Sequence, residues 1–408
     1  MVHSRNSLHL FKANQPLSLF LICLTSLLSS ACSQNSSPPN IVLIFADDLG
    51  YCDSELYGCN AVPTPNIKRL ATEGALFTSG YVTSPVCSPS RASIMTGRYQ
   101  QRFGHEFLPE GDPSGDSGLP LSEKTIADYL KESGYITGMT GKWHLGNNEE
   151  FHPLERGFDE WYGIIAAATD YADPTRTDVK SFNFTKYIAK KALEKTIPTS
   201  ELSKMTSNQI HNALQEQGLS DIAVWFLRSG DDSTWKGRGA GRVFRGRQIV
   251  LEPDYLTDAF SREAVAFIRK YKQNPFFLYV PYTATHGPLQ VTQEYYDRFP
   301  EIENEQKRIY AAMTASLDDG IGLILDALTE TGLEENTLVI FLSDNGAGVA
   351  DYASNAPLRL GKHTLFEGGV RVPFAIKWPK KIPKGSIYSN PVSSLDVLPT
   401  AVVAARGS

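Results

Sequence analysis

The sequence predicts an α/β fold in which a mixed, largely parallel central sheet lies between layers of helices. Uninterrupted apolar runs occupy 40–46, 276–280 and 337–342, and runs without polar alternation are typical of strands buried on both faces. Amphipathic helical patterns separate these runs, the clearest over 257–272. With 408 residues the chain exceeds what one core comfortably fills, so we expect one large domain plus a smaller piece.

Composition narrows the class of partner. The formal net charge of -6 argues against a nucleic-acid-binding protein, because such proteins carry an excess of basic residues. An anionic substrate stays open, because a local cationic pocket can sit on an acidic protein. The hydrophobic share of 41% and the charged share of 21% are ordinary for a soluble globular enzyme.

The N-terminus predicts export. Basic residues precede the apolar run 17–28, and a small-residue stretch then leads to Cys32. We interpret 1–31 as a signal peptide, Cys32 as a lipid-bearing first residue that anchors the chain to a membrane, and 32–39 as a tether. The product would be a periplasmic or outer-membrane-associated lipoprotein. Because Ser29 is unusual in such a signal, a plain signal cleaved nearby is the first alternative, and a retained span is the second.

Five cysteines need an assignment. Cys23 leaves with the signal peptide and Cys32 would carry lipid. Cys52 and Cys59 are close enough to pair in an oxidising compartment, although their spacing does not show that they do. Cys87 is left over, and an odd cysteine in an exported protein requires its own explanation.

The first predicted strand, 40–46, ends in Asp47 and Asp48. Paired carboxylates at the carboxyl end of a buried strand suit a hard cation, which takes oxygen ligands. For such a pair taken alone, two turn-forming acids are the alternative. A short amphipathic helix over 65–74 then brings the chain to Cys87.

Cys87 is predicted at or just before the first turn of a helix that Gly97 ends. Pro89 fits that turn, where an N–H group has no intrahelical partner. Arg91 lies one turn on from Cys87, on the same face. A helix N-terminus and an arginine aimed at one point make an anion site, so a nucleophile there would meet a tetrahedral oxyanion. A buried cysteine beside a surface arginine is the alternative.

A helix over 122–133 and a strand over 135–139 come next, followed by Lys142 and His144, which can both reach a cleft. The pattern then becomes poor over 164–253. We interpret that stretch as an insertion over one edge of the cleft, which either faces the substrate or has no role. Within it, 186–217 has a helical composition and 230–247 is loop-like.

The second half repeats the order of helix, strand and polar residue. The helix 257–272 leads to the strand 276–280 and then to His286. A long helix over 306–332 follows, in which a break near Asp318 and Asp319 stays open. We assign these two acids to an exposed or capping face rather than to metal.

The strand 337–342 runs into Asp344 and Asn345, which offer two more oxygen ligands. A further strand over 374–378 and a last helix capped by Asp396 complete the chain. The polar residues that follow four strands would meet in one crevice, because strand ends of an open α/β sheet converge.

Three motifs carry a family resemblance. They are Cys87-Ser88-Pro89-Ser90-Arg91 with Thr96-Gly97-Arg98, then Gly141 to Gly146, and then Gly361 to Pro373. Together they resemble type I sulfatases of the alkaline phosphatase superfamily, over about 40–400 and least over 164–253. The resemblance implies an alkaline phosphatase/sulfatase-like catalytic domain over 40–408, from which the usual smaller C-terminal antiparallel domain is absent. We therefore expect the 408-residue chain to be poorly soluble or weakly active unless a second chain covers the open face.

The resemblance also implies a site. A formylglycine-generating enzyme would oxidise Cys87 to formylglycine, whose hydrated aldehyde is the nucleophile. Ca²⁺, with Mg²⁺ as the alternative, would be held by Asp47, Asp48, Asp344, Asn345 and the modified Cys87. The sulfate cradle and the acid–base groups would be Arg91, Lys142, His144, His286 and Lys362. Which histidine serves which step stays open.

The implied function is hydrolysis of sulfate esters, on a sulfated carbohydrate. The segment 97–106 resembles bacterial polysaccharide sulfatases, and His105 and Glu106 either touch a sugar or form a structural turn. The alternatives are a phosphodiester or phosphonate monoester hydrolase of the same superfamily and a non-catalytic, glycan-binding surface lipoprotein.

Overall fold

The computed structural model describes residues 37–60, 62–109, 116–173, 176–182, 192–194, 196–202, 205, 207–218, 242–348 and 352–406. The expected signal peptide 1–31, Cys32 and most of the tether lie outside these residues. The chain divides into two compact units, Met1–Ser37 and Pro38–Ser408. Everything below concerns the second unit.

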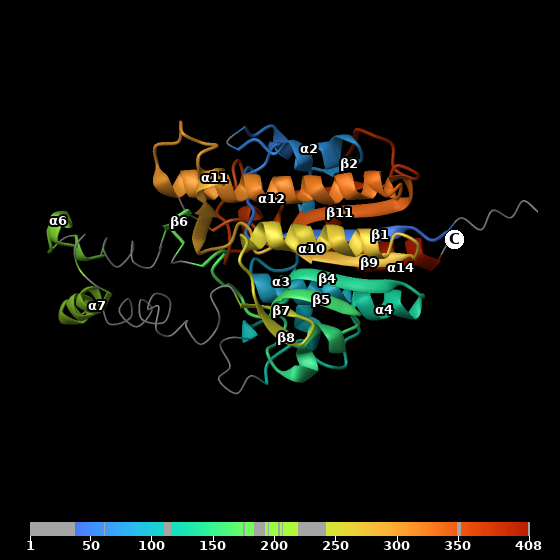
Figure 1. The fold of residues 1–408 in the computed structure, drawn as a ribbon, viewed down its shortest axis with the longest axis horizontal. Coiled ribbons are helices and arrows are strands. Elements are labelled where there is room, and N and C mark those ends of the chain that lie inside the picture. Colours follow the sequence, from blue (N-terminus) through green and yellow to red (C-terminus); the bar gives the residue numbers. More distant parts are fainter. Residues whose placement is uncertain are drawn as a thin grey trace, which may run out of the picture. The chain divides into compact units, whose positions relative to one another are not determined.

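A ten-stranded mixed sheet organises the fold, as predicted (Figure 1). At its centre β1 (Asn40–Ala46) runs parallel to both β11 (Thr337–Ser343) and β9 (Phe276–Pro281). On one side β4 (Ile136–Lys142) and β5 (Glu160–Ile164) continue in parallel. On the other side follow β12 (Phe374–Lys377), β2 (Ala75–Phe77) and β13 (Ser386–Tyr388). The strand β12 is antiparallel to its two neighbours.

The central strand is apolar throughout because both faces of the sheet are covered. Val42 and Ile44 enter one core, which contains residues of α2 (Pro65–Thr72), α10 (Leu256–Lys270) and α12 (Glu305–Glu330). Leu43 and Phe45 enter a second core with residues of α3 (Cys87–Thr96), α4 (Ile126–Glu132) and α14 (Val397–Arg406). In Figure 1, α10 and α12 run side by side. Each fully buried aliphatic side chain contributes about 1.5–3 kcal/mol.

Helix ends differ from the predictions where capping residues decide them. The helix expected over 122–133 begins only at Ile126, because Thr125 and Asp128 form a capping box ahead of it. The long helix α12 passes Gly320 without a break. A Cβ atom at Gly320 would lie 2.3 Å from Ser261 Oγ, so this glycine permits close packing of α12 on α10. Asp396 caps the last helical segment through the Ser393 amide, as predicted.

The stretch 164–253, expected to be an insertion, contains strands as well as helices. Its β6 (Val179–Phe182) pairs with β10 (Leu289–Thr292), and β7 (Arg242–Arg245) and β8 (Gln248–Leu251) form a hairpin that extends the central sheet. The loop predicted over 230–247 is therefore wrong for β7, since Gly246, with a φ of 61°, supplies a tight hairpin turn. Two helices, α6 (Thr199–Leu202) and α7 (Ser207–Glu216), lie in the helical stretch. Much of 183–241 falls outside the described residues.

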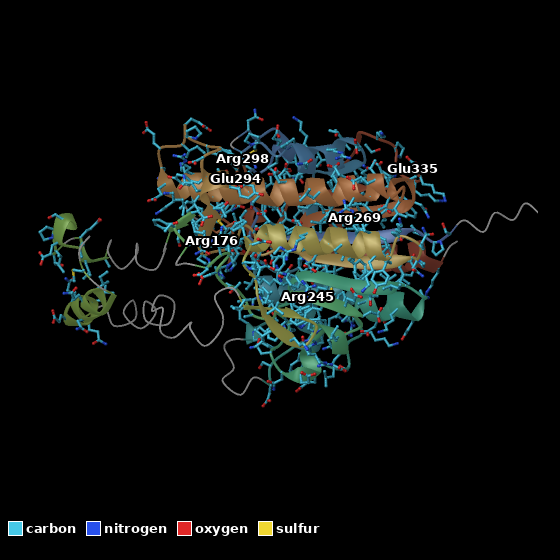
Figure 2. All side chains as sticks on the ribbon, viewed as in Figure 1. Arg176, Arg245, Arg269, Glu294, Arg298 and Glu335 are labelled. Carbon is cyan, nitrogen blue, oxygen red and sulfur yellow. A yellow bond between two sulfur atoms is a disulfide. The ribbon has the colours of Figure 1, made fainter. Side chains whose placement is uncertain are left out.

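The remaining short elements connect these layers. They are β3 (Gly80–Tyr81), β14 (Val392–Ser393), α11 (Gln293–Tyr296) and α13 (Glu367–Val370). Cys52 and Cys59 form a disulfide with Cα atoms 5.5 Å apart, which answers the question that their spacing left open. Charged side chains such as Arg245, Arg269 and Arg298 lie on the outside (Figure 2). Within the described residues, none of the helices combines the length and the apolar character that a membrane span requires.

Candidate active site

Backbone hydrogen bonds join the carboxyl ends of three central strands at one place. The Asp344 amide donates to Ala46 O at 3.0 Å, and the Asp47 amide donates to Ala284 O at 2.9 Å. The Thr285 amide in turn donates to Asp47 O at 2.7 Å. The residues that follow β1, β9 and β11 are therefore fixed against one another, as the convergence of strand ends predicts.

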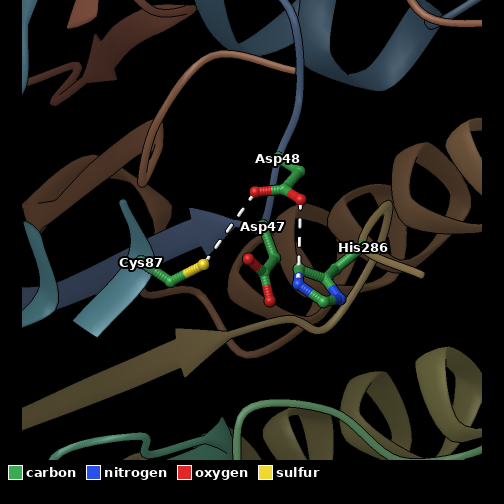
Figure 3. A group of neighbouring side chains, drawn as sticks. All are labelled: Asp47, Asp48, Cys87 and His286. Carbon is green, nitrogen blue, oxygen red and sulfur yellow. Dashed lines mark hydrogen bonds and ion pairs between the residues drawn. The ribbon is translucent and has the colours of Figure 1, made fainter. Parts of the chain in front are cut away.

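Four side chains, from the segments that follow β1 and β9 and from α3, form a compact group (Figure 3). Ligand-type atoms of Asp47, Asp48, Cys87 and His286 all lie within 4.8 Å of one another. Cys87 Sγ is 4.0 Å from Asp48 Oδ1, and His286 Nε2 is 3.8 Å from Asp48 Oδ2. The structure thus brings together a sulfur, two carboxylates and an imidazole that the sequence places up to 239 positions apart.

Cys87 is the first residue of α3, as the sequence predicts, and Val86 before it is extended. Its free thiol is buried and 3.1 Å from Lys362 Nζ. Burial raises the pKa of this thiol to about 12, although Lys362 and Lys142 act against the shift. Since only a thiolate is a strong sulfur nucleophile, unmodified Cys87 is poorly suited to attack a substrate.

Buried cations neutralise the acids that follow β1. Lys142, the last residue of β4, donates to Asp47 Oδ2 at 2.6 Å. Burial alone would raise the pKa of Asp47, but Lys142, His286 and Arg91 hold it well below its ordinary value. Lys362 Nζ lies 2.7 Å from Asp48 Oδ2. Burial would likewise raise the pKa of Asp48, and Lys362 lowers it. Both carboxylates are therefore ionised.

Arg91 is fully buried and faces the carboxylates directly. Its Nε and Nη2 atoms donate to Asp344 Oδ2 at 3.1 and 2.8 Å, and its Nη1 donates to Lys142 O at 3.1 Å. Burial and the neighbouring Asp47 together raise the pKa of Asp344 to about 7, against the opposing effect of Arg91. The geometry therefore makes Arg91 an orienting partner of Asp344, whereas the expected contact of Arg91 with sulfate stays a prediction.

Two buried oxygens in this group test whether a divalent metal ion fits it. Asp47 Oδ1 and Asn345 Oδ1 have no hydrogen-bond partner among the described residues, and a buried unsatisfied oxygen costs about 1–3 kcal/mol. The amide of Asn345 is oriented by its Nδ2, which donates to Asp48 Oδ1 at 2.7 Å and to Gly346 O at 2.9 Å. The oxygens of Asp47, Asp48, Asp344 and Asn345 suit a hard cation such as Ca²⁺ or Mg²⁺ better than zinc. Asp47, Asp48 and the unpartnered oxygens therefore fit a hard divalent cation, whereas Asp344 lies outside the group within 4.8 Å and is bound by Arg91 and the Asp48 amide.

Strained backbone is concentrated in the segments that carry the site. Among the described residues, four that are not glycine have a positive φ: Asp48, His144, Leu360 and His363, at 58–67°. Such conformations persist only where surrounding contacts impose them. Here the His144 amide donates to Ile165 O at 3.1 Å, and the His363 amide donates to Pro85 O at 3.0 Å. The Lys362 amide donates to Ala347 O at 2.9 Å, so the loop is held at the lysine and at the residue that follows it.

His105 has a structural position. It is fully buried, and its Nε2 and Nδ1 atoms lie 2.8 Å from Ser88 Oγ and 3.2 Å from Gly118 O. Ser88 Oγ donates onward to His144 O at 2.7 Å. Burial lowers the pKa of His105 to about 4, so it is neutral. Of the two readings, the structural turn fits and a sugar contact by His105 does not, whereas Glu106 is exposed.

Sequence reasoning missed several residues that support the site. Ser343 Oγ accepts from the Leu49 amide at 3.0 Å and donates to Asn345 O at 2.8 Å. Tyr171, from the poorly patterned stretch, donates its hydroxyl to the turn that carries His286. Ser343 could have been noticed because it directly precedes Asp344. No periodicity or motif marks Tyr171.

Comparison with known proteins places this geometry in one family. The chain belongs to the sulfatase family, whose model matches residues 39–408. It is 32% identical over 382 residues to N-acetylgalactosamine-6-sulfatase of Canis lupus familiaris, covering 90% of this chain and 62% of that protein. It is also 32% identical over 394 residues to arylsulfatase H of the same species, covering 90% and 68%.

A solved structure also matches this chain. The crystal structure of Ps i-CgsB in complex with k-i-k-neocarrahexaose is 37% identical and matches with a TM-score of 0.72, covering 90% of this chain and 72% of that one. The chain thus spans about two thirds of the length of these relatives.

Proposed function

We propose that this chain carries the catalytic centre of a sulfatase, which hydrolyses a sulfate ester with water to an alcohol and inorganic sulfate. The observation that carries the proposal is the buried Cys87 at the start of α3, with Lys362 at 3.1 Å and the Asp47–Asp48 carboxylates beside it. A sulfate group is a tetrahedral oxyanion, and fixed cations around its binding point stabilise the charge of the transition state.

The high pKa of the Cys87 thiol supports its conversion to formylglycine, because the reaction then needs no thiolate. The hydrated aldehyde would supply an oxygen nucleophile in place of sulfur. Lys362, at 3.1 Å from Sγ, would contact the hydroxyl groups that replace it, and Lys142 holds Asp47 ionised. His286 presents Nε2 toward the same point and serves the leaving oxygen.

We infer that the metal is Ca²⁺, with Mg²⁺ as the alternative. Asp47, Asp48, Asp344 and Asn345 would hold it, and the two unpartnered oxygens support this set. A divalent cation polarises the S–O bonds of the substrate and offsets its negative charge. Arg91 then keeps Asp344 aligned for the metal.

The substrate is proposed to be a sulfated carbohydrate. Two of the relatives support this class: one is named for an N-acetylgalactosamine sulfate, and the other was solved with k-i-k-neocarrahexaose. The test is hydrolysis of a panel of sugar sulfates, aryl sulfates and phosphodiesters by the wild-type protein. We expect release of sulfate from a sulfated oligosaccharide. Activity restricted to phosphodiesters or phosphonate esters would contradict the proposal.

We propose further that the protein is exported and anchored through an acylated Cys32, as the sequence of the N-terminal segment indicates. Replacement of Cys32 by serine is expected to release the protein from the membrane fraction or to block its maturation. Equal partitioning of both forms into the detergent phase would leave only an ordinary signal peptide.

A further inference from the structure

Tyr171 is one of the largest fully buried side chains among the described residues, although the sequence around it shows no regular pattern. Its single hydroxyl hydrogen is shared between the carbonyl oxygens of Thr283, at 2.5 Å, and His286, at 2.8 Å. These residues begin and end a turn that the His286 amide closes by donating to Thr283 O at 2.9 Å. One hydroxyl therefore holds both ends of the turn that follows β9.

Tyr171 is itself fixed at each of its other polar groups. Its amide donates to Gln290 Oε1 at 2.6 Å, and its carbonyl accepts from the Leu256 amide at 2.7 Å. Its ring stacks on Tyr255 with centroids 5.6 Å apart, and the Tyr255 hydroxyl donates to Gln290 O at 2.9 Å. Burial raises the pKa of Tyr171 well above its ordinary value, so the hydroxyl remains a donor. Tyr171, itself fixed through its amide, carbonyl and ring, therefore anchors the turn.

The anchored turn decides which nitrogen of His286 faces the site. His286 Nδ1 lies 2.6 Å from Gly287 O. Because a carbonyl oxygen only accepts, Nδ1 must carry the hydrogen. Nε2 is then the nitrogen on the side of Asp48 and Cys87, as Figure 3 shows for the ring. A shift of the turn would move this nitrogen away from the reacting group.

We propose that Tyr171 is a positioning residue for His286, whose buried hydroxyl holds Nε2 of the histidine toward the leaving oxygen of the substrate. The inference rests on the proposed function, in which His286 serves that oxygen. Tyr171 touches no reacting atom in this account. A displacement of about 1 Å in a catalytic group can cost roughly 100-fold in rate. Removal of the Tyr171 hydroxyl should therefore lower kcat by a measurable amount.

The test compares Tyr171→Phe with a matched control, Tyr135→Phe. Tyr135 is also buried and donates its hydroxyl to a backbone carbonyl, Pro39 O at 2.7 Å, but at the amino ends of β1 and β4. Both variants are assayed with 4-nitrophenyl sulfate, which has a good leaving group. They are also assayed with the sugar sulfate that the wild-type protein hydrolyses fastest, because its alcohol is a poor leaving group.

His286 can protonate the leaving oxygen only when its ring carries a hydrogen on Nε2 as well as on Nδ1, and this proton transfer matters most for the poor leaving group. For Tyr171→Phe we therefore expect kcat to fall about tenfold or more on the sugar sulfate, and less than about threefold on the aryl sulfate, with KM nearly unchanged. Tyr135→Phe should leave both kcat values at the wild-type level. An equal loss on both substrates, or no loss on either, would overturn the positioning role.

Hydrogen exchange separates this inference from the proposed function. Tyr171→Phe is expected to speed exchange of the amides in 283–288, where the His286 amide closes the turn, and Tyr135→Phe is not. Unchanged exchange in Tyr171→Phe would show that the hydroxyl does not anchor the turn. A wild-type protein that cleaves neither sulfate ester would instead contradict the proposed function, while the exchange result would still decide the anchoring.

Discussion

Among the described residues, two Asp-Asp pairs lie at 47–48 and 318–319, and their surroundings differ. Asp318, on α12, accepts from the amides of Asn66 and Ile67 at 2.8–3.1 Å and so caps the N-terminus of α2. Its neighbour Asp319 is partly exposed and pairs with Arg298 at 2.6 Å. Of the exposed or capping face expected for these acids on their own helix, Asp319 is partly exposed, whereas Asp318 is buried and caps a different helix, α2.

The pair Asp47–Asp48 is buried to a similar degree but meets cations instead of amides. Lys142 and Lys362 bind its carboxylates, and one oxygen of Asp47 has no partner among the described residues. Accordingly the pKa of Asp47 is held well below its ordinary value, whereas burial raises the pKa of Asp318 to about 6. The comparison shows why only one of the two acidic pairs is proposed to bind a metal. Adjacent buried cations and an unsatisfied oxygen are the features that separate the two.

The largest effect is expected from Asp47→Ala and Asp344→Ala. Each change removes a proposed metal ligand, so turnover should fall by about 1,000-fold or more. Asp47→Ala also leaves Lys142 without its carboxylate partner, whereas Asp344→Ala leaves Arg91 with only its 3.5 Å ion-pair contact to Asp47. Loss of one partner of a buried ion pair should also cost about 3–5 kcal/mol of stability. The loss of turnover is measured as kcat, and the loss of stability is measured by urea unfolding. Turnover within tenfold of wild type in a folded Asp47→Ala variant would contradict the metal assignment.

Metal removal should reproduce the loss of activity without a change in sequence. Exhaustive chelation is expected to abolish sulfate release, and added Ca²⁺ to restore it. Because a ligand that binds only the folded state stabilises it, chelation should also lower Tm. The Tm of Asp47→Ala should not respond to Ca²⁺. If the chelated wild-type protein remains fully active, the site does not work through a metal.

The contribution of Asp318 to stability should depend on pH and not on metal. The pKa of Asp318 rises from 3.8 to about 6 on folding, so folding favours its protonated form. That contribution is present below about pH 4 and is lost as the pH rises through 6. Relative to Asp318→Asn, which cannot titrate, wild type should lose up to about 3 kcal/mol between pH 3.5 and 7. A constant difference between the two unfolding curves would refute this contrast.

The smallest effect is expected from Asp318→Ala at neutral pH. Removal of an N-cap carboxylate costs about 1 kcal/mol of stability, and kcat should stay at the wild-type value because Asp318 lies outside the site. The measurement is urea unfolding together with turnover. A large loss of turnover in a protein of normal stability would mean that the two acidic pairs are coupled in a way that the structure does not suggest.

Much of the site could be predicted because strand ends and motifs mark it. Asp47, Cys87 and Asp344 each follow or begin an element with a clear pattern, so the sequence places them correctly. The β7–β8 hairpin was harder, because a Gly- and Arg-rich composition conceals two short strands that depend on pairing with β5. Tyr171 could not be found at all, since its role depends on a carbonyl group 115 positions away.

The central claim is that Cys87 works as an aldehyde and not as a thiol, and the mass of the tryptic peptide that contains Cys87 tests it most directly. The protein should be purified from its native host or from one with a formylglycine-generating enzyme, and turnover of a sulfate ester measured on the same sample. We predict that the peptide has lost its thiol in favour of an aldehyde, and that turnover rises in proportion to the converted fraction. A sample in which Cys87 is entirely thiol, yet which hydrolyses the sulfate ester at full rate, would contradict the account.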